Sequence, residues 1–166
     1  MIKLIIKTLI IILLTINNNN NNNENKTNKT VQNTEIIGNI IIDKINLNKP
    51  LYNINNNKNN IEENIEVLKE SILPPNNNSI IFLAAHSGTS NISYFNELDK
   101  LNLKDEILLT INNKNYIYIV KNIYTQKKNG YININKEKNN QLILTTCDPN
   151  NNKNQLIINS IIKEFN

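Results

Sequence analysis

The chain of 166 residues contains no Arg and no Trp, and it has one Cys, one His and three Gly. A single Cys excludes an intrachain disulfide framework, and one Cys with one His cannot form a structural zinc site from protein ligands alone. The net charge of +4 comes from scattered Lys residues, which is too weak a signal for nucleic-acid binding. Without Arg, the bidentate guanidinium contacts that recognise phosphates and bases are absent too. We therefore expect no nucleic-acid partner.

The residues that are abundant are Asn, Ile and Lys, a skew that matches AT-rich codons. Hydrophobic residues make up 39% of the chain and aromatic residues 5%, so a core can form, and it must be built mainly of Ile and Leu. The length is typical of one domain.

The N-terminus has the pattern of a targeting segment. Lys3 and Lys7 accompany an apolar run, Leu4–Ile16, and a positive start before an apolar stretch is typical of a secretory signal or signal-anchor. The run is short of the roughly 20 residues that cross a bilayer comfortably, and no small-x-small cleavage motif follows. We predict a signal-anchor at 1–16, with the bulk of the protein outside the cell membrane. The alternative is that this run forms a strand of the core.

An Asn-rich tract with almost no apolar residues follows at 17–34. Such a composition is typical of a disordered linker. We therefore predict that the folded domain covers 35–166.

Within that domain the apolar runs are short and Ile-rich, which favours strands over helices. The strand candidates are Ile36–Ile42, Leu51–Ile54, Ile80–Ala85, Glu106–Ile111, Tyr116–Tyr124, Tyr131–Ile134, Gln141–Thr146 and Leu156–Ile162. Asn112-Asn113 lies between two of them and is typical of a hairpin turn. Helical spacing predicts one helix over 61–72, ended by Pro74-Pro75, and a second over 94–101 after a Ser93 cap. Eight strands and two short helices predict a mainly β barrel or sandwich.

Two residues stand out as candidates for chemistry. His86 follows the apolar run Ile80–Ala85, and Cys147 follows Gln141–Thr146, so both lie where a predicted strand becomes a loop. A strand end fixes a side chain while the loop leaves it accessible, which suits a catalytic pair. A thiolate is a strong nucleophile and is stabilised by a nearby imidazolium. The alternatives are a buried structural Cys and a structural His.

Around these residues the chain resembles the sortases, the membrane-anchored cysteine transpeptidases of Gram-positive bacteria. Leu83-Ala84-Ala85-His86-Ser87-Gly88 resembles the strand that ends in the family's catalytic His, and Leu144-Thr145-Thr146-Cys147 matches most of the Thr-Leu-x-Thr-Cys motif, with Ile143 in place of its first Thr. Tyr94–Leu101 resembles the helix that follows the His strand. The resemblance covers about residues 36–163 and implies an eight-stranded β-barrel with two short helices.

One family feature is missing. Sortases have an Arg shortly after the Cys, at the start of the last strand, which helps to stabilise the oxyanion. The matching position here is Gln155, whose amide can donate a hydrogen bond but carries no charge, and Lys153 is a nearby cation. Losing one oxyanion donor typically costs about 2.7–4 kcal/mol of transition-state stabilisation, so both a slower enzyme and an inactive one are consistent with this change.

The resemblance implies a complete chemistry. Cys147 would attack a Leu-Pro-x-Thr-Gly-like sorting signal of a secreted protein, His86 would act as general acid, and Gln155 would bind the oxyanion. A cell-wall precursor or a pilin amine would resolve the thioacyl enzyme. Thr146 would orient substrate, or else only fill its strand. This chemistry needs no metal and no organic cofactor.

Two other functions remain open from the sequence. The missing Arg favours a non-catalytic, exported sortase-like domain that binds peptide or cell wall. A papain-like hydrolase fits less well, because such enzymes usually have Cys before His in the chain.

Overall fold

The computed structural model describes residues 36–135, 137 and 140–163. In this part of the chain the strands are β1 (Ile36–Ile42), β2 (Leu47–Tyr52), β3 (Glu66–Val67), β4 (Ile80–Ala84), β5 (Glu106–Ile111), β6 (Lys114–Lys127), β7 (Gln141–Cys147) and β8 (Asn154–Ile162), with the 3₁₀ helices η1 (Asp43–Ile45) and η2 (Leu98–Lys100). The predicted signal-anchor at 1–16 and the predicted linker at 17–34 lie outside the described residues. Among the residues described, we find no helix with the length and apolar character needed to span a bilayer.

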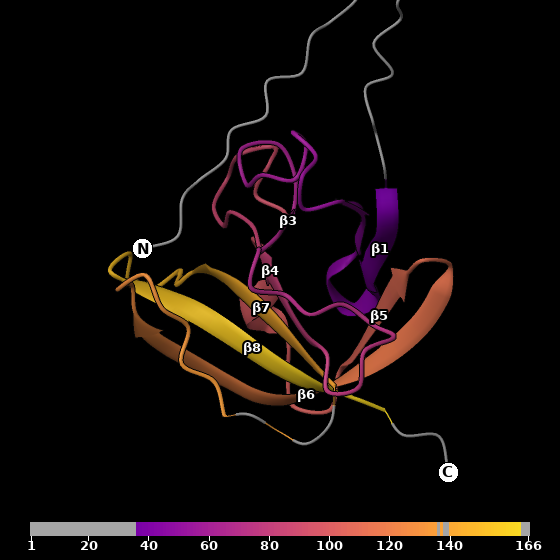
Figure 1. Cartoon of the computed structure of the whole chain (residues 1–166). Coiled ribbons are helices and arrows are strands. Elements are labelled where there is room, and N and C mark those ends of the chain that lie inside the picture. Colours follow the sequence, from indigo (N-terminus) through magenta and orange to yellow (C-terminus); the bar gives the residue numbers. More distant parts are fainter. Residues whose placement is uncertain (1–35, 136, 138–139, 164–166) are drawn as a thin grey trace, which may run out of the picture. The chain divides into compact units, whose positions relative to one another are not determined.

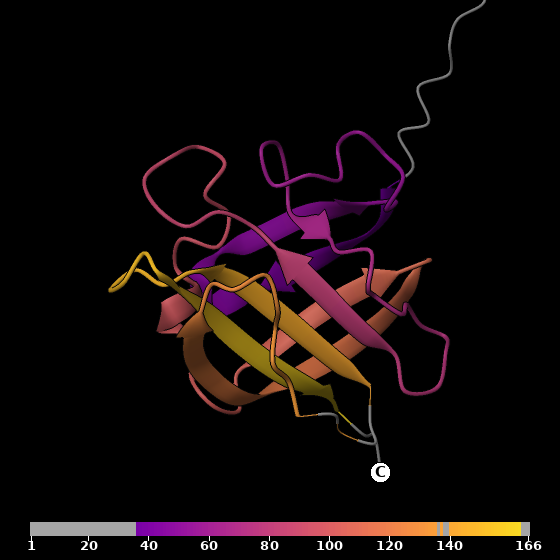
Figure 2. The same ribbon diagram turned by 60° about the vertical axis from the view of Figure 1, so that its left-hand side comes forward.

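All eight strands form one sheet in the order β2-β1-β5-β6-β8-β7-β4-β3. The neighbouring strands are antiparallel except β4 and β7, which run parallel. The edge strands β2 and β3 approach each other, so the sheet curls into a nearly closed barrel (Figures 1 and 2). The predicted mainly β, eight-stranded barrel is confirmed.

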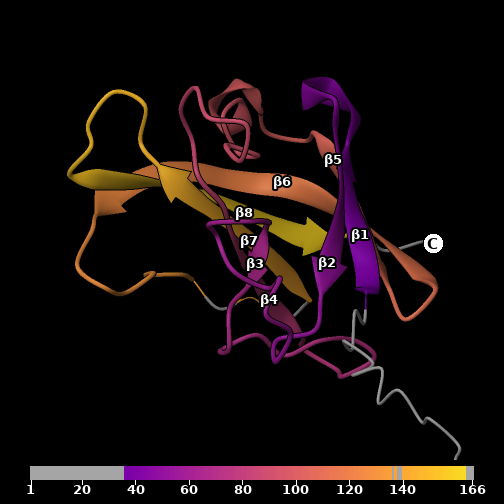
Figure 3. The same cartoon turned by 90° about the horizontal axis from the view of Figure 1, so that it is seen from above.

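The long strand β6 joins the two halves of the barrel. Its first half pairs with β5 and its second half with β8, and the register with β8 shifts between Val120 and Asn122. Figure 3 shows β6 passing from β5 to β8 across the molecule. A shift of this kind bends a strand, which lets one segment belong to both halves.

Two local features of the strands follow directly from residue type. The turn between β5 and β6 consists of Asn112 and Asn113, both at positive φ (50° and 63°), as a two-residue hairpin turn requires; this prediction is confirmed. In β1, a Cβ atom on Gly38 would overlap the carbonyl oxygen of Thr110 in β5. Glycine is therefore needed there for the two strands to pair.

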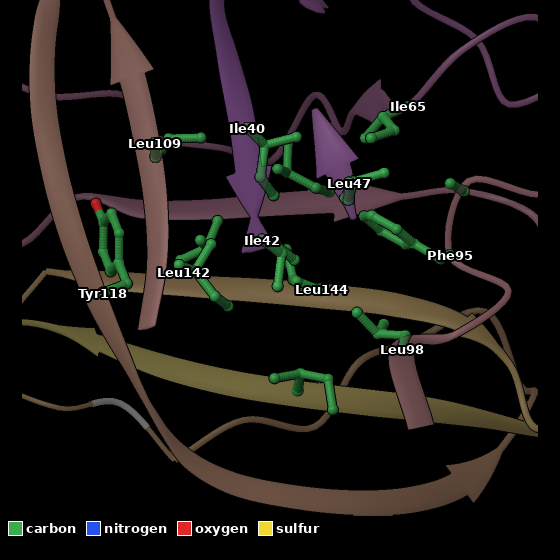
Figure 4. Close-up of a cluster of buried hydrophobic side chains, with 14 of the residues drawn as sticks. Ile40, Ile42, Leu47, Ile65, Phe95, Leu98, Leu109, Tyr118, Leu142 and Leu144 are labelled. Carbon is green, nitrogen blue, oxygen red and sulfur yellow. The ribbon is translucent and has the colours of Figure 1, made fainter. Parts of the chain in front are cut away.

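The core fills the inside of the barrel and is made of aliphatic side chains from nearly every strand. Figure 4 shows Ile40 and Ile42 of β1, Leu109 of β5, and Leu142 and Leu144 of β7 pointing toward one another. Phe95 and Leu98, from the segment after β4, close one side. Ile and Leu supply most of the buried surface, as their abundance predicted.

The predicted helix over 61–72 is wrong. The segment instead contains turns and the short strand β3. Ile65 and Val67 are both buried with Glu66 between them, which is the period of a strand. The Asn59 side chain also holds Val67 extended, because its amide donates to the Val67 carbonyl (3.0 Å) and its oxygen accepts from the Val67 N–H (2.8 Å). An Asn side chain that bonds the backbone in this way competes with helix formation.

The predicted helix over 94–101 is reduced to turns and the three residues of η2. The N–H groups of Asn96 and Leu98 bond carbonyls three residues earlier, which is the 3₁₀ pattern and is rarely sustained. Phe95, Leu98 and Leu101 are all buried, so the apolar face was predicted correctly even though the regular α-helix was not.

The predicted strand Tyr131–Ile134 is wrong as well. Its backbone groups bond side chains instead of a strand: the Tyr131 carbonyl accepts from Gln126 and Gln155, and the Asn133 N–H donates to Gln126. The Tyr124 hydroxyl donates to the Asn133 carbonyl. The segment is therefore an extended loop held against the sheet by side chains, without a strand partner in the described part of the chain.

Candidate active site

The parallel pairing of β4 with β7 brings His86 and Cys147 to the same edge of the sheet. Ala84 of β4 pairs with Thr145 of β7, and His86 and Cys147 each lie two residues further on. Adjacent strands are about 4.8 Å apart, so the backbones of these two residues leave the sheet as neighbours.

Strand alternation places both side chains on the outer face. Ala85 and Thr146 are buried toward the core, and side chains on a strand alternate between its faces. His86 and Cys147 follow them and therefore point outward. Cys147 is partly exposed and its thiol is free, so both sequence-predicted residues lie on the accessible face of neighbouring strands.

Hydrogen bonds hold this sheet edge in place. The Thr146 hydroxyl donates to the Ala85 carbonyl (2.8 Å), and the Ser87 hydroxyl donates to the Cys147 carbonyl (3.0 Å). Each bond joins the segment that carries His86 to the segment that carries Cys147. Thr146 is only 6% exposed, so it braces the pair from inside the barrel; a role for Thr146 in orienting substrate stays a prediction.

His86 has one polar side-chain neighbour among the described residues. Its Nε2 lies 3.3 Å from Oε1 of Glu62, in the loop between β2 and β3. The His86 side chain is 32% exposed and that of Glu62 is 75% exposed, so solvent screens this pair. Glu62 was not identified from the sequence, because the predicted helix assigned it to a solvated face.

On the other side of Cys147 lies β8, and Gln155 is its direct partner. The register pairs Cys147 with Gln155, and Gln155 in turn with Gln126 of β6. The Gln155 amide donates to the Tyr131 carbonyl (2.9 Å), a bond that Gln126 also makes. The position matched to the family's Arg is therefore next to the thiol, and its amide holds the loop that follows β6.

Lys128 makes the contact with the thiol that the sequence did not predict. Its Nζ lies 3.0 Å from Sγ of Cys147, and its backbone N–H donates to the Lys153 carbonyl (3.0 Å). In the sequence Lys128 is one Lys of a Lys-Lys pair at the end of an apolar run, and the contact depends on pairing between β6, β8 and β7. Lys153, the cation named from the sequence, makes no side-chain contact with Cys147 among the residues described.

A hollow of about 490 Å³ lies on the outer face of the sheet near this edge. It is lined by Leu68, Glu70, Phe82 and residues 130–133. Phe82 lies in β4, and His86 is four residues further along the chain, so both side chains point to the same face. At 3.3 Å per residue, the two residues are about 13 Å apart. An extended peptide of about four residues spans that distance.

The described residues contain no group of three or more His, Cys, Asp and Glu side chains arranged to hold a metal ion. The side chains placed around this sheet edge are one thiol, one imidazole, one ammonium and one amide, those of Cys147, His86, Lys128 and Gln155. The β4–β7 register makes the backbones of His86 and Cys147 neighbours, while their side chains contact Glu62 and Lys128, respectively.

The comparisons with known proteins identify the family. The sortase domain model matches residues 40–161, and the chain therefore belongs to the sortase family, whose members are cysteine transpeptidases. No curated protein sequence matches the chain.

Solved sortase structures share the fold. Sortase C1 from Streptococcus agalactiae is 28% identical with a TM-score of 0.70, over 82% of this chain and 72% of that one. Sortase C from Clostridium perfringens, solved with its C-terminal cell wall sorting motif, is 26% identical with a TM-score of 0.67, over 80% and 72%. Sortase A from Corynebacterium diphtheriae, a lid mutant, is 22% identical with a TM-score of 0.71, over 84% and 76%; at that identity the likeness concerns the fold alone.

Proposed function

We propose that this protein is a sortase-type cysteine transpeptidase that cleaves a Leu-Pro-x-Thr-Gly-like sorting signal and transfers the acyl group to an amine. The observation that carries the proposal is the β4–β7 register, with His86 and Cys147 as neighbours on the outer face of one sheet edge. Membership of the sortase family supports the reaction class.

In this mechanism the Cys147 thiolate attacks the carbonyl carbon of the Thr–Gly bond. A C–S bond forms, and the electron pair of the carbonyl moves onto its oxygen. When the oxyanion collapses, the C–N bond breaks and His86 gives its proton to the leaving amine. The acyl group then remains on Cys147 as a thioester, and an acceptor amine resolves it.

The hollow beside Phe82 suits the substrate. Leu68, Phe82 and Ile132 give it apolar walls, which fit the Leu-Pro end of such a signal. The span of about four extended residues from Phe82 to His86 matches the four residues that precede the cleaved bond. The sorting motif bound to the Clostridium perfringens relative is in keeping with this substrate class.

The partners and location belong to the same proposal. The donors are secreted proteins with a C-terminal sorting signal, and the acceptor is a cell-wall precursor or a pilin amine. The apolar run at 1–16 anchors the protein in the cell membrane with a single pass, and the catalytic domain lies outside the cell.

The direct test is a transfer reaction. A sorting-signal peptide library is incubated with the protein and an amine acceptor such as triglycine, and the products are identified by mass. We expect a product that joins the residues up to Thr to the acceptor. Peptides that bind but are never cleaved by the wild-type protein would instead favour a non-catalytic, peptide-binding sortase-like domain.

A further inference from the structure

We propose that Lys128 is the catalytic cation of this site: its ammonium pairs with the Cys147 thiolate and then with the oxyanion formed on the substrate. Only the second part of this inference, the pairing of Lys128 with the oxyanion, rests on the proposed function. It begins with one contact, Nζ of Lys128 to Sγ of Cys147 at 3.0 Å. Among the described residues, Lys128 is the one whose side chain contacts this sulfur.

The position of Lys128 is fixed by the sheet. The β6–β8 ladder ends with Lys127 paired to Asn154, and the Lys128 N–H continues it by donating to the Lys153 carbonyl. Side chains of Gln126 and Lys128, two residues apart, point to the same face. That face is the outer one, because Gln126 and Gln155 share the Tyr131 carbonyl there.

Only a long side chain at position 128 can reach the Cys147 thiol. Strand β8 lies between β6 and β7, so Lys128 is two strand spacings, about 10 Å, across the sheet from Cys147. It is also two residues, about 7 Å, further along, because the register aligns Cys147 with Gln126. The four-carbon stem of a lysine covers most of that distance. A short polar residue at 128 would leave the thiol without a cation from this side.

The other polar groups near the thiol carry no positive charge, have a partner of their own or lie elsewhere. The Gln155 amide donates to Tyr131, the His86 imidazole faces Glu62, and Asp148 accepts the N–H of Asn150. Lys153 lies in the loop between β7 and β8 and is exposed. Of the charged and titratable groups packed around the thiol, Lys128 is therefore the one that offers a positive charge at contact distance.

The chemistry requires such a charge twice. A thiolate is the reactive form of cysteine, and a neighbouring Lys stabilises it. When that thiolate attacks a carbonyl, its negative charge moves to the carbonyl oxygen, where a donor is worth the most. The ammonium has three N–H donors, so it can follow the charge from sulfur to oxygen without giving up a proton.

The first test measures the thiol without any peptide. Alkylation of Cys147 by iodoacetamide is followed by intact mass from about pH 6 to pH 10 in wild type, Lys128→Gln, Lys128→Arg and Lys127→Gln. Below about pH 8 we expect Lys128→Gln to react about tenfold more slowly, and to converge with wild type at the alkaline end. Lys128→Arg keeps the charge and should react like wild type. Lys127→Gln removes the neighbouring charge from the opposite face and is the matched control.

A second variant separates charge from structure. Because Gln155 is the register partner of Cys147, an Arg at that position reaches the same thiol, and Lys128→Gln/Gln155→Arg should regain the alkylation rate at neutral pH. With a cleaved peptide, Lys128→Gln should lower kcat by at least about tenfold while KM changes little. Each of these results supports a charge effect.

The outcomes separate this inference from the proposed function. If Lys128→Gln alkylates like wild type at every pH, the Lys128 pairing is overturned even if the protein cleaves peptides. If the wild-type protein cleaves no peptide while its alkylation depends on Lys128, the transpeptidase proposal fails and the Lys128–Cys147 pair stands.

Discussion

At the scale of single residues, the proposed reaction depends on two side chains that occur once each in the sequence. Cys147 is the one thiol and His86 the one imidazole, and the register of two parallel strands makes them neighbours. Neither side chain has a substitute elsewhere in the sequence. Their separate contributions can therefore be measured by single substitutions.

Replacing His86 by Ala should lower the rate of peptide cleavage by about 10²–10⁴, the usual contribution of general acid–base catalysis. The measurement is single-turnover acylation by a cleaved peptide. Glu62→Gln is the matched control, and because Glu62 is largely exposed it should change the rate little. Unchanged acylation in His86→Ala would mean that the imidazole is structural.

A second residue-scale prediction concerns Tyr118 in the core. Burial raises its pKa to about 12, with the nearby Ser79 hydroxyl opposing the shift, although neither hydroxyl achieves hydrogen-bond geometry. The folded protein thus keeps this phenol neutral, while the unfolded chain ionises near pH 10. The stabilisation is full below about pH 10 and is lost as the pH rises toward 12.

Tyr118→Phe tests this account by urea unfolding at about pH 8 and pH 11. Removing a buried hydroxyl without a partner should leave the stability unchanged or raise it by about 1 kcal/mol at pH 8. Between the two pH values, wild type should lose about 1 kcal/mol more than the variant. Equal losses in both proteins would contradict the assignment.

At the scale of elements, the loop after β6 depends on two glutamines. Gln126 and Gln155 both donate to the Tyr131 carbonyl, but only Gln155 is paired with Cys147. The two residues thus hold the same loop, and only Gln155 is also next to the thiol. The loop also lines the hollow next to the site.

We predict that Gln155→Ala lowers the acylation rate of a cleaved peptide, because its amide can donate to an oxyanion that develops in the transition state. Gln126→Ala should weaken peptide binding, raising KM, and leave kcat near wild type. Both constants are measured by steady-state kinetics. If Gln155→Ala and Gln126→Ala both change only KM relative to wild type, then Gln155 holds the loop and does not bind the oxyanion.

Period-two alternation and turn residues predicted most strands but not all elements. β1 and β5 were predicted with their exact bounds, because acidic residues or Asn flank both apolar runs and leave little choice. β3 was missed, since two residues carry too little pattern and the Asn59 side chain creates the extended backbone. The segment 131–134 alternates like a strand, yet side chains of Gln126 and Gln155 take the place of a partner strand.

At the scale of the whole molecule, the strands of the described barrel pair only with one another. Each pairing joins segments within 36–162. Because these described pairings already link all eight strands, we predict that the barrel folds without residues 1–34.

Deleting residues 1–34 should give a folded, soluble protein with the same urea midpoint for unfolding as the barrel of the full chain. The measurements are circular dichroism and size-exclusion chromatography. An insoluble or unfolded product would show that the N-terminal run belongs to the core, which was the alternative for that segment.

The candidate site residues that could be predicted from the sequence are those that lie at the ends of predicted strands. His86 and Cys147 were predicted because each follows an apolar run, and Gln155 because the resemblance matches it to the family's Arg. Lys128 was not predicted, because its contact with Cys147 crosses β8 and depends on the register of three strands. A residue whose role is set by long-range pairing leaves no local pattern in the sequence.

The central claim is that Cys147 forms a thioacyl intermediate, and its most direct test is the mass of the protein after incubation with sorting-signal peptides in the absence of an amine. We predict an adduct equal to the peptide residues up to Thr, mapped to Cys147, and released by an added amine. Cys147→Ala should keep its fold, because the side chain is only partly buried, and should form no adduct. Unmodified wild-type protein, with a thiol that still reacts with iodoacetamide, would contradict the account.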